Sequence, residues 1–177
     1  MAKKKHSNQT HQLTPFEFVK TKARTFPIHK CYINSDWYEM GLVNIIIVRR
    51  KPGGSFLAGI YSLETYLKGI IRTRAFANIS EKEIDEYLEI IAPRKRDENM
   101  IVEIDYTLAH NIIYGAIAFA KTQSFEPEFE FDCTQYILEE DDGKIEKIEL
   151  DFENNIMRRE YLLENERLKK LDIPSEE

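Results

Sequence analysis

The chain has few cysteines, few glycines and no long apolar run. Its 177 residues include two cysteines, Cys31 and Cys133, without a Cys-x-x-Cys pair. This argues against a disulfide framework and favours a reduced, cytoplasmic setting. No apolar run approaches the roughly 20 residues that cross a bilayer. No apolar segment follows the basic opening MAKKKHSNQTHQ, so neither a membrane partner nor a secretory signal is predicted.

Short catalytic motifs are missing as well. The chain contains no GxxxxGK[ST], GxSxG, HExxH or GxGxxG, which argues against the nucleotide-binding and hydrolytic sites that these motifs build. His29 and Cys31 would project from one face of a strand, and Cys133 and His110 are the economical choices to complete a zinc site. Because the paired Cys/His spacing is missing, the sequence predicts no metal and no cofactor.

The composition is that of a globular protein, with 42% hydrophobic and 32% charged residues. Thr14 to Glu17 and Ser80 to Glu83 have the pattern of capping boxes, and Asp105 precedes a long apolar helix pattern with Gly115 inside it. A glycine at mid-helix indicates close packing by a neighbour.

Strand patterns cover residues 28–33, 42–48 and 55–66, and the second of these is apolar on both faces, as in a strand inside a sheet. A further hairpin is expected around Asp141-Asp142-Gly143, with a second turn at Asn154-Asn155. The predicted fold class is α+β: a single domain over residues 14–163, with an antiparallel-rich sheet, a buried central helix and flanking helices. Residues 1–13 are expected to be a flexible basic arm, and 164–177 an acidic, charged tail.

Charge is unevenly distributed along the chain. Residues 1–30 contain seven Lys/Arg and one Asp/Glu, and residues 31–125 contain eleven Lys/Arg and twelve Asp/Glu. Residues 126–177 contain seven Lys/Arg and eighteen Asp/Glu, and the net charge of the chain is −6. Such asymmetry favours a basic surface for a polyanion and an acidic region that could bind a basic protein. The turn RRKPGG carries three cations that turning the chain does not require. The basic residues expected at element ends are Lys3, Lys4, Lys5, Lys20, Lys22, Arg24, Arg49, Arg50, Lys51, Arg72, Arg74, Arg94, Lys95 and Arg96.

Two stretches carry a resemblance to a known family. The first stretch has a Trp, a Gly, a strand ending in Arg and a Gly turn, in SDWYEMGLVNIIIVRRKPGGSFLAGIYSLETYLKGI. The second has a His-x-hydrophobic-hydrophobic-Tyr-Gly-Ala helix, in AHNIIYGAIAFAKTQSFEPEFEF. Both resemble an uncharacterised bacterial family, some members of which carry a zinc-binding SEC-C tail. Glu64 stands where that family has Asp, and Glu128 where it has His. The resemblance covers roughly residues 30–152 and implies a fold unit and a bacterial origin, but no reaction.

These observations lead to three hypotheses. The first is an accessory protein that binds RNA, another nucleic acid or a ribonucleoprotein through the basic residues, with Trp37, Tyr38 and Phe76 near enough to stack on bases. The second is a hydrolase or nuclease that uses Asp36, Glu64 and His110, with Glu39 and Asp105 as further carboxylate candidates. This hypothesis requires Asp36, Glu64 and His110 to meet in one pocket. The third is a protein-interaction subunit of a larger assembly.

Overall fold

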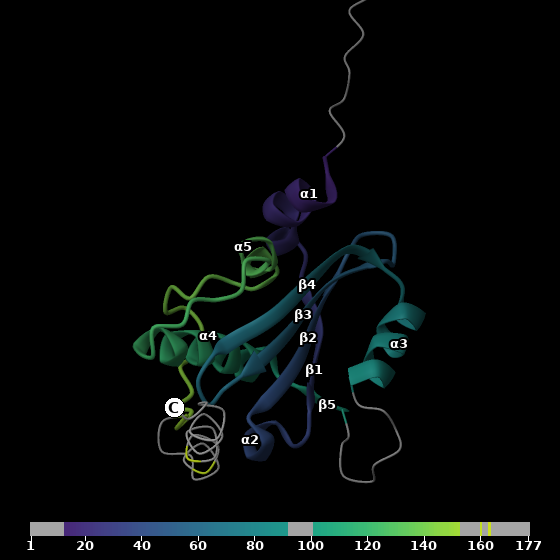
Figure 1. The fold of residues 1–177 in the computed structure, drawn as a ribbon. Helices are drawn as coiled ribbons and strands as arrows, with labels where there is room; N and C mark the ends of the chain where they lie inside the picture. The colour runs from purple at the N-terminus through teal and green to yellow at the C-terminus, as the bar shows by residue number, and fades with distance from the viewer. Residues whose placement is uncertain (1–12, 92–100, 153–159, 161–162, 164–177) are drawn as a thin grey trace, which may run out of the picture.

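A five-stranded antiparallel sheet forms the centre of the protein (Figure 1). The computed structural model describes residues 13–91, 101–152, 160 and 163. Neighbouring strands follow the order β4-β3-β2-β1-β5, so β4 and β5 are the edges. The strands are β1 (Ile28–Asn34), β2 (Leu42–Arg50), β3 (Phe56–Glu64), β4 (Gly69–Ile79) and β5 (Ile101–Ile104). With its helices the sheet makes one α+β domain, which confirms the predicted fold class.

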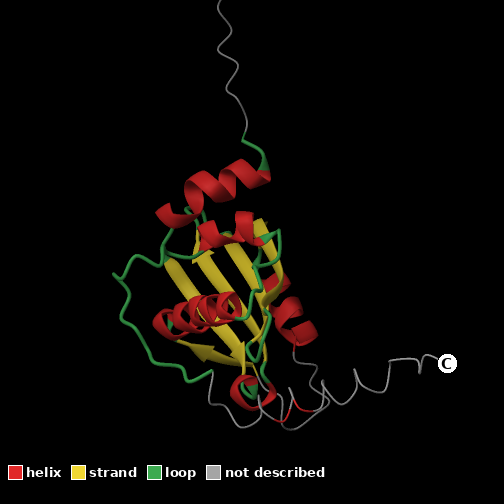
Figure 2. Ribbon diagram, turned by 60° about the vertical axis from the view of Figure 1, so that its left-hand side comes forward, coloured by secondary structure: helices red, strands yellow, loops and turns green. Residues whose placement is uncertain are grey.

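Helices cover both faces of this sheet (Figure 2). The long helix α4 (Tyr106–Thr122) crosses one face, and α3 (Glu81–Ile91) packs on the other. Ile45 and Ile47 of β2 belong to the core under α4, whereas Ile46 and Val48 belong to the smaller core under α3. Because successive strand residues face opposite sides, the continuous apolar run of β2 fills both cores.

The helices begin where the sequence places its caps. In α1 (Pro15–Lys22) the Thr14 side chain accepts from the Glu17 amide, and the Glu17 carboxylate accepts from the Thr14 amide. Ser80 and Glu83 form the same pair before α3, and the Asp105 carboxylate accepts from Thr107 N in α4. Short helical segments complete the fold: η1 (Ala23–Thr25), α2 (Trp37–Met40), α5 (Phe131–Thr134) and η2 (Gln135–Ile137).

The close packing expected at Gly115 is provided by Phe152. A Cβ added at Gly115 would lie 2.9 Å from a ring carbon of Phe152, which is buried. Residues 138–152 thus run back along α4. None of the helices in the described part of the chain is long and apolar enough to cross a bilayer.

The hairpin expected around Asp141-Asp142-Gly143 is wrong, since residues 138–152 contain no strand. Their backbone bonds to the side chain of Asn111 in α4 instead: Asn111 Nδ2 donates to Glu146 O at 2.8 Å, and Ile148 N donates to Asn111 Oδ1 at 3.0 Å. The Asn111 side chain therefore provides hydrogen bonds that a partner strand would otherwise give to the backbone of residues 146 and 148. Strands β4 and β5 were not predicted. The turn at Asn154-Asn155 and residues 1–12 and 164–177 lie outside the described residues.

Candidate nucleic-acid interface

The three cations of RRKPGG point in three directions. Arg49 and Arg50 end β2, so their side chains leave the sheet on opposite faces. Lys51 follows the strand and reaches sideways to the edge strand β4. The hairpin is therefore not a finger of three exposed charges.

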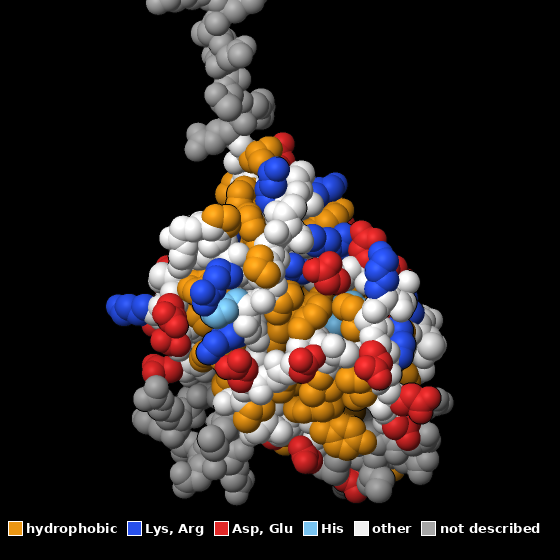
Figure 3. Space-filling view, turned by 180° about the vertical axis from the view of Figure 1, so that it is seen from behind, with side chains coloured by type: hydrophobic (Ala, Val, Ile, Leu, Met, Phe, Trp, Pro, Cys, Tyr) orange, Lys and Arg blue, Asp and Glu red, His pale blue; other side chains and the backbone are white. Residues whose placement is uncertain are grey.

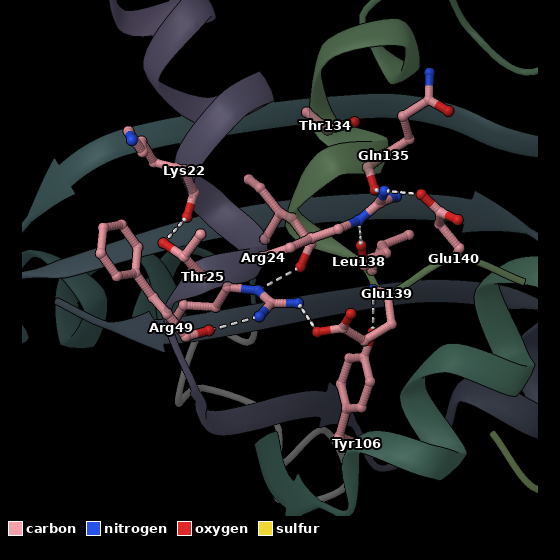
Figure 4. Close-up of polar contacts among 12 residues, drawn as sticks. Lys22, Arg24, Thr25, Arg49, Tyr106, Thr134, Gln135, Leu138, Glu139 and Glu140 are labelled. Atoms are coloured by element: carbon pink, nitrogen blue, oxygen red, sulfur yellow. Dashed lines mark hydrogen bonds and ion pairs between the residues drawn. The ribbon is translucent and has the colours of Figure 1, made fainter. Parts of the chain in front are cut away.

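Arg49 is an internal residue, and its expected role in contacting a polyanion is wrong. Its side chain is 1% exposed. Nε donates to Ile137 O at 2.7 Å, Nη1 donates to Phe26 O at 2.6 Å, and Nη2 pairs with Glu139 Oε1 at 2.7 Å. Figure 4 shows this guanidinium facing Glu139, whose amide in turn donates to the Tyr106 hydroxyl. Arg49 thus fastens the 137–139 segment and the chain before β1 to the sheet.

Arg24 has a related role at the surface. It donates through Nε to Leu138 O at 2.8 Å and forms an ion pair with Glu140 (Figure 4). Its guanidinium carbon and Lys20 Nζ each lie 5.5 Å from the ring centroid of Tyr136. We call Arg24 and Arg49 the internal arginines, because most of their donors bind residues 135–140 of the same chain.

Arg50 lies on the α3 face beside His29. Its Nη2 is 3.0 Å from His29 Nε2, and its guanidinium carbon is 5.8 Å from the Phe56 ring centroid. Burial, followed by the charge of Arg50, lowers the pKa of His29. His29 stacks on Phe56 in this position, whereas Cys31 is buried in the core under α4. A shift of register between Ile28 and Lys30 separates the two side chains, so the expectation that they share a face is wrong.

Lys51 joins the hairpin to the end of β4. Its Nζ donates to Ala77 O at 3.0 Å and to Asn78 Oδ1 at 2.9 Å, and it lies 5.3 Å from the ring centroid of Phe18 in α1. Its ammonium has no carboxylate partner among the described residues. Lys22, one helical turn after Phe18, is exposed on the same short helix.

Arg72 and Arg74 lie within β4, not after a strand as the sequence suggested. Leu63 pairs with Ile70 and Ser62 pairs with Arg72, which leaves Ile71 as an additional residue on β4. This bulge changes the alternation: without it, Ile71 rather than Arg72 would lie opposite Ser62. Both arginines are exposed, and within the described ranges neither has a carboxylate at ion-pair distance. We call them the groove arginines.

A groove lies between β4 and α3, as one side of a cavity of about 810 Å³ that continues over the edge of β4 to Thr73, Glu130, Cys133 and Thr134 on the α4 face. The groove arginines line it together with Ile60 of β3 and Tyr87 and Ile90 of α3. Phe76 continues this surface: its ring centroid lies 4.9 Å from the Arg74 guanidinium carbon and 4.9 Å from the Tyr87 centroid. The sequence named Phe76 but missed Tyr87. The apolar residues of α3 recur at i, i+3 and i+4, a spacing that indicates a core position for Tyr87.

The remaining candidates either lie outside the described residues or contact other parts of the protein. Lys3, Lys4, Lys5, Arg94, Lys95 and Arg96 lie outside the described residues. Trp37 packs against the core under α4 and meets Tyr38 edge to face at 5.5 Å. On the face opposite to that of Figure 1, the basic and acidic side chains of the described residues are interspersed (Figure 3), and these residues form no continuous basic surface there.

The acid/base candidates are each held by separate contacts. The buried Glu64 carboxylate accepts from the amides of Tyr66, Leu67 and Lys68 and closes the β3–β4 turn. Asp36 accepts from Asn34 Nδ2 at 2.7 Å. Across the described residues, no hydrogen bond or ion pair joins Asp36, Glu64 and His110.

His110 is buried in α4, beside the backbone of Glu139 and Glu140. It is 2% exposed, its Nε2 has no hydrogen-bond partner among the described residues, and its ring contacts Tyr106 and Tyr114. Burial lowers the pKa of His110, while a backbone hydrogen bond at Glu139 opposes that shift. Burial also raises the pKa of Cys31 to about 12 and so keeps this thiol protonated.

A search for clusters of three or more His, Cys, Asp or Glu that could hold a metal ion found none within the residues that the structure describes. Comparison of the chain with protein-family models, with curated proteins and with solved structures gave no match. The resemblance to the SEC-C-linked bacterial family therefore stays a prediction.

Proposed function

We propose that the protein is an accessory RNA-binding protein, acting on free RNA or within a ribonucleoprotein of the bacterial cytoplasm, and that it binds the phosphate backbone along β4. The observation that carries this proposal is the pair of groove arginines. Both are exposed, they lie two residues apart on an edge strand, and no described carboxylate neutralises them. Unneutralised arginines at an accessible edge are suited to phosphate contacts.

The other available cations extend this line. A strand rises about 3.3 Å per residue, so the six steps from Arg72 to Asn78 span about 20 Å. Lys51 is bound at the far end of this span, next to Phe18 of α1, and Lys22 follows on that helix. Spaced cations along an edge bind a polyanion without reading its sequence.

Four carboxylates in the described part of the acidic region, which starts at residue 126, have partners other than the groove arginines. Of its carboxylates, Glu139 and Glu140 pair with the internal arginines, while Asp141 and Asp142 pair with Lys147 and Lys144 in the segment that runs along α4. A basic protein partner for this acidic region remains a prediction that no contact in the described chain favours.

The test is the salt dependence of binding to a short unstructured RNA, measured by fluorescence anisotropy. Lys22→Ser, Arg72→Ser and Arg74→Ser together should weaken binding strongly. They should also lower the slope of log affinity against log salt by about 2, since each phosphate contact to a single strand contributes about 0.7.

The matched control changes the same number of exposed cations elsewhere, as Lys82→Ser, Lys121→Ser and Lys144→Ser, and should retain the wild-type slope. Wild-type protein without salt-dependent binding, or equal losses in the two triple variants, would refute the proposal.

A further inference from the structure

On the basis of the RNA-binding function proposed above, we infer that the groove between β4 and α3 holds an unpaired nucleobase, so that the protein selects single-stranded over double-stranded RNA. The groove arginines alone would bind phosphates of either form. The remaining surface of the groove is what distinguishes the two.

The groove has the size and the walls of a site for a small planar group. The whole cavity, of which the groove is the α3 side, has a volume of about 810 Å³, within the range of about 300–1,000 Å³ that is typical of small-ligand sites. Ile60 and Tyr87 supply apolar and aromatic wall. Tyr87 is held by its contact with Phe76, so an aromatic side chain is fixed at the groove before any ligand arrives.

Apolar side chains are exposed at the edges of the groove. Ile90 is 71% exposed and lines it, and Ile71 at the β4 bulge, next to Arg72, is 42% exposed. A surface that only bound phosphate would gain nothing from these side chains. Apolar surface beside arginines suits a ligand with a flat face and an anionic linkage, which is the chemistry of a nucleotide.

The polar groups that line the cavity are divided between the two faces of β4. The groove arginines lie on the α3 face, opposite Ser62 and Ile60. Glu130 and Thr73 line the cavity from the α4 face, on which Thr73 lies opposite Tyr61. The charge on the α3 face of the groove is therefore positive, and a phosphate bound at the arginines places its base on the same face as Tyr87.

A base can enter such a groove only when it is unpaired. In an A-form duplex the bases are stacked inside the helix, and sequence-tolerant contacts are limited to phosphates and 2′-hydroxyls. Occupation of the groove therefore adds affinity for single strands and none for duplexes.

The experiment compares three labelled probes of equal length: an unstructured RNA, the same RNA as a duplex, and an abasic oligonucleotide with the same backbone charge. Tyr87→Ala should weaken binding of the single-stranded RNA by about tenfold, in line with the usual effect of removing one stacking partner. It should leave the abasic probe unaffected, and Tyr87→Phe should stay within twofold of wild type. Arg72→Ser with Arg74→Ser should weaken binding of all three probes.

Tyr87 also packs on Phe76, so Ile90→Ser serves as a second variant at an exposed position. It should weaken the single-stranded RNA by about threefold and the abasic probe not at all. Equal wild-type affinity for RNA and abasic probes, or equal losses on both in Tyr87→Ala and Ile90→Ser, would overturn the base site and leave the RNA-binding proposal intact. Failure of every probe to bind wild-type protein would overturn the proposed function itself.

Discussion

The internal arginines and the groove arginines are the same residue type in one small domain, yet they have opposite surroundings. Arg49 directs its guanidinium into the protein, to two backbone carbonyls and Glu139. Arg72 and Arg74 lie two strands away and face a groove without a carboxylate partner in the described chain. A basic residue in a sequence therefore indicates a binding surface only when its donors are not already used by the fold.

Register decides which of the two roles an arginine takes. Arg49 shares its face of β2 with Ile45 and Ile47, which are buried under α4. Arg72 reaches the open face of β4 only because Ile71 bulges. The regular alternation of β2 directs Arg49 into the core, whereas one additional residue in β4 places Arg72 on the open face.

The largest difference between the two pairs should appear in stability. Arg49→Met removes the partner of Glu139 and leaves Ile137 O and Phe26 O without their donor. Because breaking a buried pair costs about 3–5 kcal/mol and Glu139 is 43% exposed, we expect a loss near the lower end, about 3 kcal/mol. Urea unfolding measures this loss.

The matched control is Arg72→Met, whose side chain makes no such bonds and which should change the free energy of unfolding by less than about 0.5 kcal/mol. If both variants lost the same stability, the distinction between internal and groove arginines would be wrong.

A smaller effect is expected at Arg24, whose ion pair with Glu140 is partly exposed. Arg24→Ser should reduce the free energy of unfolding by about 1 kcal/mol, since exposed pairs contribute about 0.2–1 kcal/mol and the bond to Leu138 O is lost with the pair. The slope of log affinity against log salt for RNA binding should stay the same as in the control variant Lys82→Ser, Lys121→Ser and Lys144→Ser. A decrease in this slope as large as that caused by Arg72→Ser would instead assign Arg24 to the interface.

The smallest effect concerns pH. Burial lowers the pKa of His110 in the folded protein below its ordinary value, so between about pH 6.5 and the folded value the unfolded chain binds a proton that the native state does not. The free energy of unfolding should therefore fall as the pH is lowered through this window, and less so in His110→Phe. RNA binding by the groove arginines, which keep their charge, should not follow that titration.

His29, whose pKa is also lowered, contributes in the same direction and remains in both proteins, so the difference between wild type and His110→Phe isolates His110. The carboxylates of Glu17, Glu83 and Asp142 have lowered pKa values and lose their contribution at lower pH. Identical pH profiles for the two proteins would contradict the assignment.

The sequence predicted the caps, the apolar β2 and the packing at Gly115, because each depends on residues close in the chain or on a single pattern. It did not predict the site. The bulge at Ile71 leaves no mark in a single sequence. The alternation that buries Arg49 is present in β2, but the run of charges around Arg49 points to an exposed turn. The false hairpin at residues 138–152 had a real turn signal, but Asn111, far away in the chain, satisfies its backbone.

The bulge at Ile71 also has a consequence for how this surface could change over generations. Deleting that single residue would restore regular pairing while leaving Arg72 opposite Ser62 and Arg74 opposite Ile60, so both arginines would keep their face. The loss of this one codon would thus preserve the cationic edge, and point substitutions would have to remove that edge one arginine at a time.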